Sequence, residues 1–407
     1  MTRLGSMDKA QIIGIEQSRS ARVYERFPVV AVKARGASLW DIDGKEYVDC
    51  MSAYGVGVVG HCHPRVVEAI KSQAERIIAC HSSLYNDARA EFIAKLTEMA
   101  PRGLNQAFLC NSGAEAVEGA IKLARKHTGK SGIIAMMGSF HGKTMGALSV
   151  TWNPKYRDPF QPLLGNVQFV PYGNAERLRA ALTPETGAVI TEAIQGESGV
   201  KLPPEGYLQQ VRELCDEKDA LLIVDEVQTG LGRTGRLWAS EHSNVTPDIM
   251  CLAKGLGGGV PLGAVLAREE VMASFERGDH SSTFGGNPLA AAAGSAVLDV
   301  LREEGLPERA AKLGGYFEER LERLQRTYRV IRETRGRGLM LALDLRFDVR
   351  DALLQALDAG VILLYSGKAT IRLLPPLVIE QKQIDFAVEA LEKAVISEEE
   401  KMAGKPS

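Results

Sequence analysis

Residues 220–228 read Ala220-Leu-Leu-Ile-Val-Asp225-Glu-Val-Gln228, and further along the chain Lys254 stands in Leu252-Ala-Lys254-Gly-Leu-Gly-Gly-Gly-Val-Pro261. The first stretch predicts a buried strand that ends in a carboxylate. The second places a lone lysine between apolar residues, in front of a flexible glycine track. Together they are typical of a site for a cofactor that forms an imine, and they predict pyridoxal phosphate (PLP).

Asp225 and Lys254 have complementary chemical properties. PLP withdraws electrons while its pyridine nitrogen is protonated, so a carboxylate such as Asp225 must lie against that nitrogen. The cofactor's aldehyde needs an amine that can lose its charge, as a desolvated lysine can. Each residue also has a structural interpretation, Asp225 as the cap of a strand and Lys254 as a solvated surface lysine. The segments described below favour the cofactor site.

The composition is that of an ordinary globular protein. The chain has 407 residues, of which 45% are hydrophobic and 25% charged, with a formal net charge of −2. This length predicts two domains, and the charge gives no reason to expect binding to nucleic acid or to a membrane. No apolar run reaches the roughly 20 residues that span a bilayer, and the first residues lack the apolar core of a secretory signal. We therefore expect a cytoplasmic protein.

The cysteines and histidines predict neither disulfides nor a metal site. The six cysteines have no paired spacing, so we expect small buried hydrophobic residues. His61-Cys-His63 offers three potential ligands, but they are too close together for a zinc-finger pattern and no partner cluster follows.

The order of apolar runs predicts the fold class. Residues 36–49 form a predicted hairpin with Asp43-Gly44 as its turn. From about residue 65, helical patterns alternate with short apolar runs, which predicts an α/β fold with a mostly parallel sheet and helices on both faces. The site should lie at the carboxyl ends of the strands. The predicted strands cover residues 107–110, 132–137, 167–170, 188–191, 221–224 and 263–267.

A division into three parts follows from these patterns. We expect an N-terminal segment over 1–64 that packs with the small domain, a large cofactor-binding domain over 65–295 and a small C-terminal α/β domain over 296–407. A long charged helix is predicted at about 305–327. The tail from Glu398 onward reads as frayed or disordered.

Two segments are candidates for binding a phosphate group. Asn111-Ser-Gly-Ala-Glu-Ala116 follows a predicted strand and opens a helix, where the backbone N–H groups of Gly113 and Ala114 could face an anion. Ordinary Ser/Asn capping explains this motif equally well. Thr283 stands in a glycine-rich loop, and its hydroxyl could donate a further hydrogen bond to the phosphate. The alternative is that Thr283 belongs to a simple Ser/Thr turn.

Ser139-Phe-His-Gly142 again follows a predicted strand. Phe140 is placed to lie against a planar ring, and His141 could add a second contact or a hydrogen bond. Core packing is the alternative interpretation of this pair.

One motif favours another class of enzyme. Gly230-Leu-Gly-Arg-Thr-Gly235 fits the opening of a dinucleotide-binding unit directly behind a strand. The residues after it do not continue as a long helix, and no second strand ending in an acidic residue follows. A nicotinamide-dependent oxidoreductase therefore stays a rival hypothesis.

Assembled in order, these segments closely resemble the class III aminotransferases, which have fold type I among PLP enzymes, with a large, mostly parallel seven-stranded-type sheet domain and a smaller C-terminal domain. The resemblance covers about residues 25–390. It is carried by the motifs Gly60-His-Cys-His-Pro64, Asn111-Ser-Gly-Ala-Glu-Ala116, Ser139-Phe-His-Gly142, Asp225-Glu-Val-Gln-Thr-Gly230, Leu252-Ala-Lys-Gly255 and Thr283-Phe-Gly-Gly-Asn-Pro288.

The resemblance implies a role for each matching residue. Lys254 forms the imine with the cofactor, Asp225 pairs with the ring nitrogen and Gln228 contacts the phenolic oxygen. Phe140 stacks on the ring, and Thr283 binds phosphate from the neighbouring subunit, which implies a homodimer with shared active sites. The complete implied cofactor set is Gly113, Ala114, Phe140, His141, Asp225, Glu226, Val227, Gln228, Lys254 and Thr283.

The resemblance also implies how one site accepts two substrates. Arg372 binds the α-carboxylate of glutamate, and Glu197 neutralises Arg372 when a terminal-amine substrate is present. A structural ion pair is the alternative. The expected reaction transfers an ω-amino group to 2-oxoglutarate.

Within the family, Thr144–Phe160 is most similar to the acetylornithine aminotransferase branch, especially to members that act on lysine or ornithine linked to a small acidic amino-group carrier protein in lysine and arginine biosynthesis. Lys143 and Ser282 stand where this branch contacts the distal carboxylate, although position 143 is usually arginine. Tyr54 and Tyr85 resemble ornithine aminotransferase contacts, so ornithine or another ω-amino acid is an alternative donor. A PLP-dependent racemase is an alternative of a different class. Lys155 and Arg157 could provide a basic rim for a carrier.

Overall fold

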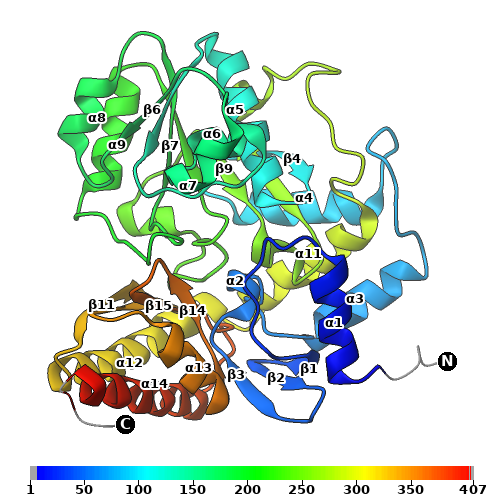
Figure 1. The fold of residues 1–407 in the computed structure, drawn as a ribbon. Helices are drawn as coiled ribbons and strands as arrows, with labels where there is room; N and C mark the ends of the chain where they lie inside the picture. The colour runs from blue at the N-terminus through cyan, green and yellow to red at the C-terminus, as the bar shows by residue number, and fades with distance from the viewer. Residues whose placement is uncertain (1–6, 403, 405–407) are drawn as a thin grey trace.

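The computed structural model describes residues 7–402 and 404. A mixed sheet of seven strands forms the centre of the larger part of the molecule, shown at the top of Figure 1. Five strands, β9 to β6 in the order below, are parallel, and β10 runs antiparallel to both of its neighbours. Across the sheet the strands are β4 (Gln106–Cys110), β10 (Gly263–Ala267), β9 (Ile249–Leu252), β8 (Leu221–Asp225), β7 (Thr186–Glu192), β5 (Gly132–Met136) and β6 (Val167–Val170).

The predicted α/β class and mostly parallel sheet are confirmed. Every predicted strand is present, but the sequence analysis missed β9, which directly precedes Lys254. Leu252 was read as the start of the lysine segment, which left only the three apolar residues 249–251, and a strand pattern needs at least four. All four residues of β9 are buried, as expected for a central strand that is covered on both faces.

Helices cover both faces of the sheet because residues of the central strands alternate between them. Ile133 and Ile223 pack with α5 (Gly113–Thr128), whereas Ile134 and Leu222 pack with α8 (Ala175–Ala181) and α9 (Tyr207–Glu217) on the other face. The remaining helices of this part are α3 (Pro64–Ala74), α4 (Asp87–Met99), α6 (Met145–Val150), α7 (Pro154–Arg157), α10 (Glu269–Met272) and α11 (Pro288–Glu303).

The N-terminal segment lies beside the C-terminal part of the chain, as the blue and orange elements at the bottom of Figure 1 show. After α1 (Lys9–Arg19) come β1 (Ala31–Arg35), β2 (Ser38–Asp41) and β3 (Glu46–Asp49), and the predicted hairpin lies between β2 and β3. Gly44, at its turn, has a φ of 85°, which favours glycine. β3 then pairs in parallel with β13 (Val361–Ile362).

The C-terminal part combines an antiparallel sheet with three helices. Its strands are β11 (Ile331–Arg337), β12 (Met340–Leu345), β15 (Thr370–Leu373) and β14 (Leu364–Ser366), and its helices are α12 (Leu306–Thr327), α13 (Arg350–Asp358) and α14 (Gln381–Met402). The predicted charged helix is confirmed as α12. The prediction of a frayed tail is wrong for residues 398–402, because α14 continues through them with Val395 and Glu398 buried. Residues 403 and 405–407 lie outside the described part.

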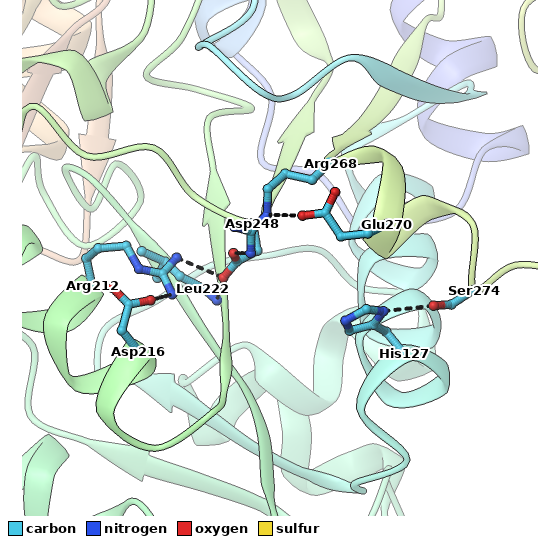
Figure 2. A network of polar contacts seen from close by, with 8 residues as sticks. All are labelled: His127, Arg212, Asp216, Leu222, Asp248, Arg268, Glu270 and Ser274. Atoms are coloured by element: carbon cyan, nitrogen blue, oxygen red, sulfur yellow. Dashed lines mark hydrogen bonds and ion pairs between the residues drawn. The ribbon is translucent and has the colours of Figure 1, made fainter.

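The buried carboxylate of Asp248 connects neighbouring strands at the end of the sheet opposite to Asp225 (Figure 2). Asp248 directly precedes β9, and its side chain is 2% exposed. It accepts a hydrogen bond from the Leu222 backbone N at 2.6 Å and pairs with Arg212 of α9 at 2.8 Å. Arg268, just after β10, forms a further ion pair with it. Asp248 therefore connects β8, β9, β10 and α9 in one register.

The rival dinucleotide-binding unit does not form at 230–235. No helix begins there in the described structure, and Arg233 is buried, with Nη1 donating to Leu339 O at 3.0 Å and to Pro375 O. This loop therefore anchors the C-terminal part instead of opening toward a nucleotide.

The remaining expectations concern cysteines, metals and membranes. Cys50, Cys110, Cys215 and Cys251 are buried, but Cys62 is exposed and Cys80 is partly exposed, so the expectation of burial is wrong for these two. Among the described residues, no His, Cys, Asp and Glu side chains gather in a group that could hold a metal ion. None of the described helices combines the length and apolar character needed to cross a membrane.

Candidate active site

A cavity of about 440 Å³ opens at the carboxyl ends of the central strands and at the start of α5. It brings together residues from six segments that are far apart in the sequence. The predicted site residues that line it are Gly113, Ala114, Phe140, His141, Glu197, Asp225, Val227, Gln228 and Lys254. The site therefore lies where a sheet of this class is expected to carry one.

Asp225 is the last residue of β8 and is held by two neighbours. Its Oδ2 pairs with His141 Nδ1 at 2.7 Å, and its Oδ1 accepts a hydrogen bond from the Val227 backbone N at 2.9 Å. His141 is buried, and the backbone N of His141 donates to Thr151 Oγ1 at 2.9 Å. The carboxylate is therefore fixed in orientation, and a cation or an N–H group in the cavity would find an oriented acceptor.

Lys254 opens a short 3-10 turn, η3 (Lys254–Gly257), directly behind β9. Its φ of 48° lies in the left-handed region, a strained conformation for a non-glycine residue that costs about 1–3 kcal/mol. Burial lowers the pKa of Lys254, while the charges of Glu197 and Asp225 oppose this effect. A lysine with a lowered pKa supplies a neutral amine, the form that reacts with an aldehyde.

Glu192 lines the same cavity and was missed in the sequence analysis. It ends β7, and its register partner on β8 is Asp225, so the two carboxylates lie side by side. Burial raises the pKa of Glu192 well above its usual range, and the charge of Asp225 raises it further. The rule that identified Asp225, an acid at the end of an apolar strand, would have found Glu192 at the end of 188–191.

The start of α5 has the geometry of a helix N-terminus that opens into the cavity. Ser112 caps the helix by accepting a hydrogen bond from the Glu115 backbone N at 3.2 Å. Gly113 and Ala114 follow in the first turn, where backbone N–H groups have no helical acceptor. A Cβ at position 113 would lie 2.8 Å from Val227 Cγ1, so this close approach requires glycine.

Glu197 lines the cavity, and the buried Arg372, which is outside the lining, forms a bidentate pair with it. The two distances are 2.9 and 3.1 Å, and Arg372 Nη1 also donates to Gly196 O at 3.1 Å. Burial alone would raise the pKa of Glu197, but Arg372 and then Lys254 outweigh it, so the pKa is lowered. Gln228 Nε2 donates to Glu197 Oε1 at 3.3 Å, and Gln228 Oε1 has no partner among the described residues.

Glu226, predicted as part of the cofactor site, is directed elsewhere. Its carboxylate accepts hydrogen bonds from the Ser240 backbone N at 2.8 Å and from Thr229 Oγ1. Contrary to the prediction, its side chain is outside the lining of the cavity, and this carboxylate stabilises the turn after β8. Neighbours in sequence at a strand end point to opposite sides, which explains the error.

Lys143 and Ser282 lie outside the cavity lining. Lys143 is exposed, and its Nζ lies 4.5 Å from the centre of the Tyr156 ring, which meets Phe140 edge-on. Ser282 Oγ accepts a hydrogen bond from Asn111 Nδ2 at 3.0 Å. Tyr156 lies in the short helix α7 and was missed because one aromatic residue in a mostly polar segment has no distinctive sequence pattern.

Three predicted residues are exposed on the surface of the single chain. Tyr54 is 47% exposed, Tyr85 is fully exposed and Thr283 is exposed, and none of them lines the cavity. The single chain therefore does not bring Tyr85 and Thr283 to its own site.

The residues of the cavity fit PLP. The cradle at Gly113, the buried acceptor Asp225 and the unpaired Gln228 Oε1 match the phosphate, the ring nitrogen and the phenolic oxygen, and Lys254 is the buried amine. When bound, PLP supplies an electron sink for the negative charge left when a substrate carbon loses its proton.

Comparison with known proteins agrees with this site. Residues 19–395 match the family Aminotransferase class-III. The chain belongs to the class III aminotransferases, enzymes that transfer amino groups with PLP as cofactor.

Within this family the chain lies in the acetylornithine aminotransferase branch. It is 51% identical over 374 residues to an acetylornithine aminotransferase of Methanopyrus kandleri, covering 91% of this chain and 95% of that protein. It is 44% identical to a LysW-aminoadipate semialdehyde transaminase of Deinococcus radiodurans, covering 94% of this chain and 90% of that protein.

Solved structures of the family have the same fold. An ornithine aminotransferase of Toxoplasma gondii superposes with a TM-score of 0.94 at 36% identity and covers 97% of this chain and 95% of its own. An acetylornithine aminotransferase of Elizabethkingia anophelis gives a TM-score of 0.86 at 36% identity, with coverage of 96% and 100%.

Proposed function

We propose that the enzyme transfers the terminal amino group of an ω-amino donor to 2-oxoglutarate, which yields a semialdehyde and glutamate. The observation that carries this proposal is the bidentate pair between Glu197 and Arg372 at the cavity wall. Arg372 is fully buried, whereas the Glu197 side chain is 31% exposed. Glu197 is therefore the member of the pair that can move.

The two states of this pair explain how two different substrates use one site. With the pair closed, the charge of Arg372 is neutralised, and the cavity accepts a terminal amine that has no carboxylate beside its reacting carbon. With Glu197 displaced, Arg372 binds the α-carboxylate of 2-oxoglutarate in the same two-pronged geometry.

The other residues have positioning and proton-transfer roles in this proposal. Lys254, whose pKa is lowered by burial, would hold the aldehyde of PLP and, once displaced by the substrate amine, would move the proton of the substrate carbon. Asp225, oriented by His141, holds the proton on the ring nitrogen. Phe140 and Val227 line the cavity as ring contacts, and Gly113 and Ala114 bind the phosphate.

We further propose that the donor is N-acetylornithine or a lysine or ornithine linked to an acidic carrier protein. The names of the relatives from Methanopyrus kandleri and Deinococcus radiodurans support both donors. Lys143 and Ser282 would bind the distal carboxylate, and the exposed Lys155 would attract an acidic carrier. Arg157 is less suited to this role, because its guanidinium lies 4.5 Å from the Phe169 ring.

The assembly and the domain division belong to the same proposal. The exposure of Tyr85 and Thr283 is consistent with a homodimer in which Thr283 completes the partner's phosphate site. The pairing of β3 with β13 supports an N-terminal segment of 1–64 that packs with a small domain over 296–407, beside a large domain over 65–295.

A screen of single half-reactions tests the proposal. The visible absorbance of the purified PLP enzyme is followed after addition of N-acetylornithine, ornithine, carrier-linked lysine, 4-aminobutyrate or free α-amino acids. We expect rapid conversion with at least one of the first three. No spectral change with any ω-amino donor would exclude the proposed function.

The Arg372→Lys variant tests how the second substrate is bound. We expect it to impair the reaction with 2-oxoglutarate more than the reaction with the donor, since lysine keeps the charge but not the two-pronged geometry. Equal loss in both half-reactions would indicate a purely structural ion pair.

A further inference from the structure

Three consecutive non-glycine residues beside the active site adopt left-handed backbone conformations. Ser52, Ala53 and Tyr54 have φ angles of 44°, 50° and 61°, and Gly55 follows with 87°. Together they form the turn α2 (Ser52–Gly55), closed by a hydrogen bond from the Val56 backbone N to Ser52 O at 2.8 Å. L-residues visit this region singly, so a run of three requires support from its surroundings.

Asp49 supplies this support at the end of β3. Its Oδ1 accepts hydrogen bonds from the backbone N–H groups of Met51 and Ser52, both at 2.8 Å. Its Oδ2 pairs with His61 Nε2 at 2.7 Å, and the Asp49 side chain is 2% exposed. His61 is in turn fixed by two backbone hydrogen bonds with Gly36, at 2.8 and 3.0 Å. The carboxylate thus connects the start of the turn to the N-terminal sheet.

The turn delivers its residues to the mouth of the cofactor cavity. Val56 lines that cavity, and a Cβ on Gly55 would lie 3.9 Å from Gln228 Cγ. Burial raises the pKa of the Tyr54 hydroxyl. The next largest effects on this pKa come from the charges of Glu197, which raises it, and Arg372, which lowers it. Tyr54 therefore lies on the side of the cavity where the two substrates are distinguished.

We propose that Asp49 and His61 are positioning residues that hold this left-handed turn, so that Tyr54 faces the incoming amino donor. The proposal rests on the proposed function in one respect, the contact between Tyr54 and the donor. Without the Asp49 carboxylate, residues 52–54 relax toward right-handed or extended conformations, which displaces the Tyr54 side chain. Lys254 and Asp225 belong to other elements and keep their places.

A double-mutant cycle on the PLP enzyme tests this role. We expect Asp49→Ala to raise the KM of the donor by roughly tenfold, the loss typical of a buried charged hydrogen bond, with a much smaller change in kcat. Tyr54→Ala should have a similar effect, and the double variant should be no worse than Tyr54→Ala alone. Additive effects in the double variant would overturn the proposal, because they would mean that Asp49 acts independently of Tyr54.

Asp41 offers a matched control in the same sheet. Its buried carboxylate also accepts two backbone hydrogen bonds, from Asp43 and Lys45, and one from the Tyr47 hydroxyl at 2.9 Å. Asp41→Ala should lower the thermal unfolding temperature as Asp49→Ala does, and leave the KM of the donor unchanged. An equal rise in KM in both variants would show that general destabilisation is the cause.

Rescue and hydrogen exchange give two further readouts. Glycine adopts positive φ without steric cost, so Ala53→Gly in the Asp49→Ala background should restore much of the donor KM.

Amide hydrogen exchange at Val56 and Gly57 should be faster in Asp49→Ala than in the wild type, and unchanged exchange would contradict the role of Asp49. Conversion of the donor by the wild-type enzyme tests the proposed function separately. A failure of the proposed function can therefore be distinguished from a failure of the role proposed for Asp49.

Discussion

Glu192 and Asp225 lie on neighbouring strands at the same level of the sheet, yet their side chains have different hydrogen-bond partners. Asp225 is paired with His141, whereas Glu192 Oε2 is buried and has no hydrogen-bond partner in the part of the chain that the structure describes. Two carboxylates this close do not both ionise readily, and burial together with the charge of Asp225 raises the pKa of Glu192, which favours its protonated form. The site therefore concentrates its negative charge at Asp225, where the ring nitrogen requires it.

This arrangement predicts a pH-dependent stability difference for Glu192→Gln. Because the folded-state pKa of Glu192 is raised above its usual 4.5, the folded protein binds a proton that the unfolded chain loses. Folding therefore becomes less favourable as pH rises above about 4.5, and glutamine removes this effect. In urea unfolding of the cofactor-free protein, the stability of Glu192→Gln relative to the wild type should increase from pH 4.5 toward neutrality. A difference that stays constant over this range would contradict the prediction, and the exposed Glu205→Gln serves as control.

Lys143 illustrates how one aromatic neighbour can orient a flexible cation. Its ammonium lies 4.5 Å from the Tyr156 ring centre, a contact worth about 0.5–1 kcal/mol at an exposed site. If Lys143 binds the distal carboxylate, Lys143→Met should raise the KM of N-acetylornithine by about tenfold, since a charged hydrogen bond is lost. Lys143→Arg should lower it by gaining the two-pronged geometry. Steady-state kinetics check both variants against Lys155→Met, which should leave the KM of this small donor unchanged.

At the scale of elements, the active site depends on the order of β8, β9 and β10. Asp225 ends β8 and Lys254 follows β9, so their separation is set by the register of these two strands. At the opposite end of these strands, Asp248 contacts Arg212, Arg268 and the Leu222 backbone N, and we expect these contacts to support the register (Figure 2).

We expect Asp248→Ala to be strongly destabilising. The substitution leaves the largely buried Arg212 without this partner, and breaking a buried ion pair typically costs about 3–5 kcal/mol. Glu270→Ala is the matched control, because Glu270 pairs with the same Arg268 at 3.2 Å but is 65% exposed, and such pairs contribute about 0–1 kcal/mol. Chemical unfolding of both variants measures the difference. Equal and small effects would show that Asp248 does not determine the strand register.

At the scale of the whole molecule, the homodimer proposed above would cover several apolar residues that the single chain exposes. Leu84, Tyr85 and Phe284 are 66%, 107% and 63% exposed, and Phe284 is next to Thr283 in sequence. Soluble monomers rarely expose such residues in one region. A dimer formed through this region would bring Thr283 toward the partner's site.

Subunit complementation tests the shared site. Lys254→Ala and Thr283→Ala variants should each have little activity alone. When they are unfolded together and refolded, a mixed dimer contains one site with both native residues, so about a quarter of all sites should recover. Activity measured after mixing, with sedimentation analysis of the assembly, checks this. No recovery in confirmed mixed dimers would mean that Thr283 serves its own subunit.

Much of the fold and most of the cofactor site could be predicted from the sequence, because the relevant signals are local. An apolar run followed by Asp225, or a strand followed by the helix that begins at Gly113, contains its own pattern of burial and termination. Six strands of the central sheet were recognised in this way, and β9 was missed because its last residue, Leu252, was read as part of the lysine segment.

The tertiary structure alone decided the features that depend on contacts between distant segments. The sequence by itself determined which residues end the strands, and hence the chemistry of Lys254 and Asp225. Only the folded chain places Glu192 beside Asp225, turns Glu226 away from the cavity and holds Tyr54 on a left-handed turn through Asp49. The physical reason is that pKa values and backbone strain are set by neighbours in space, and those neighbours are not encoded by local spacing.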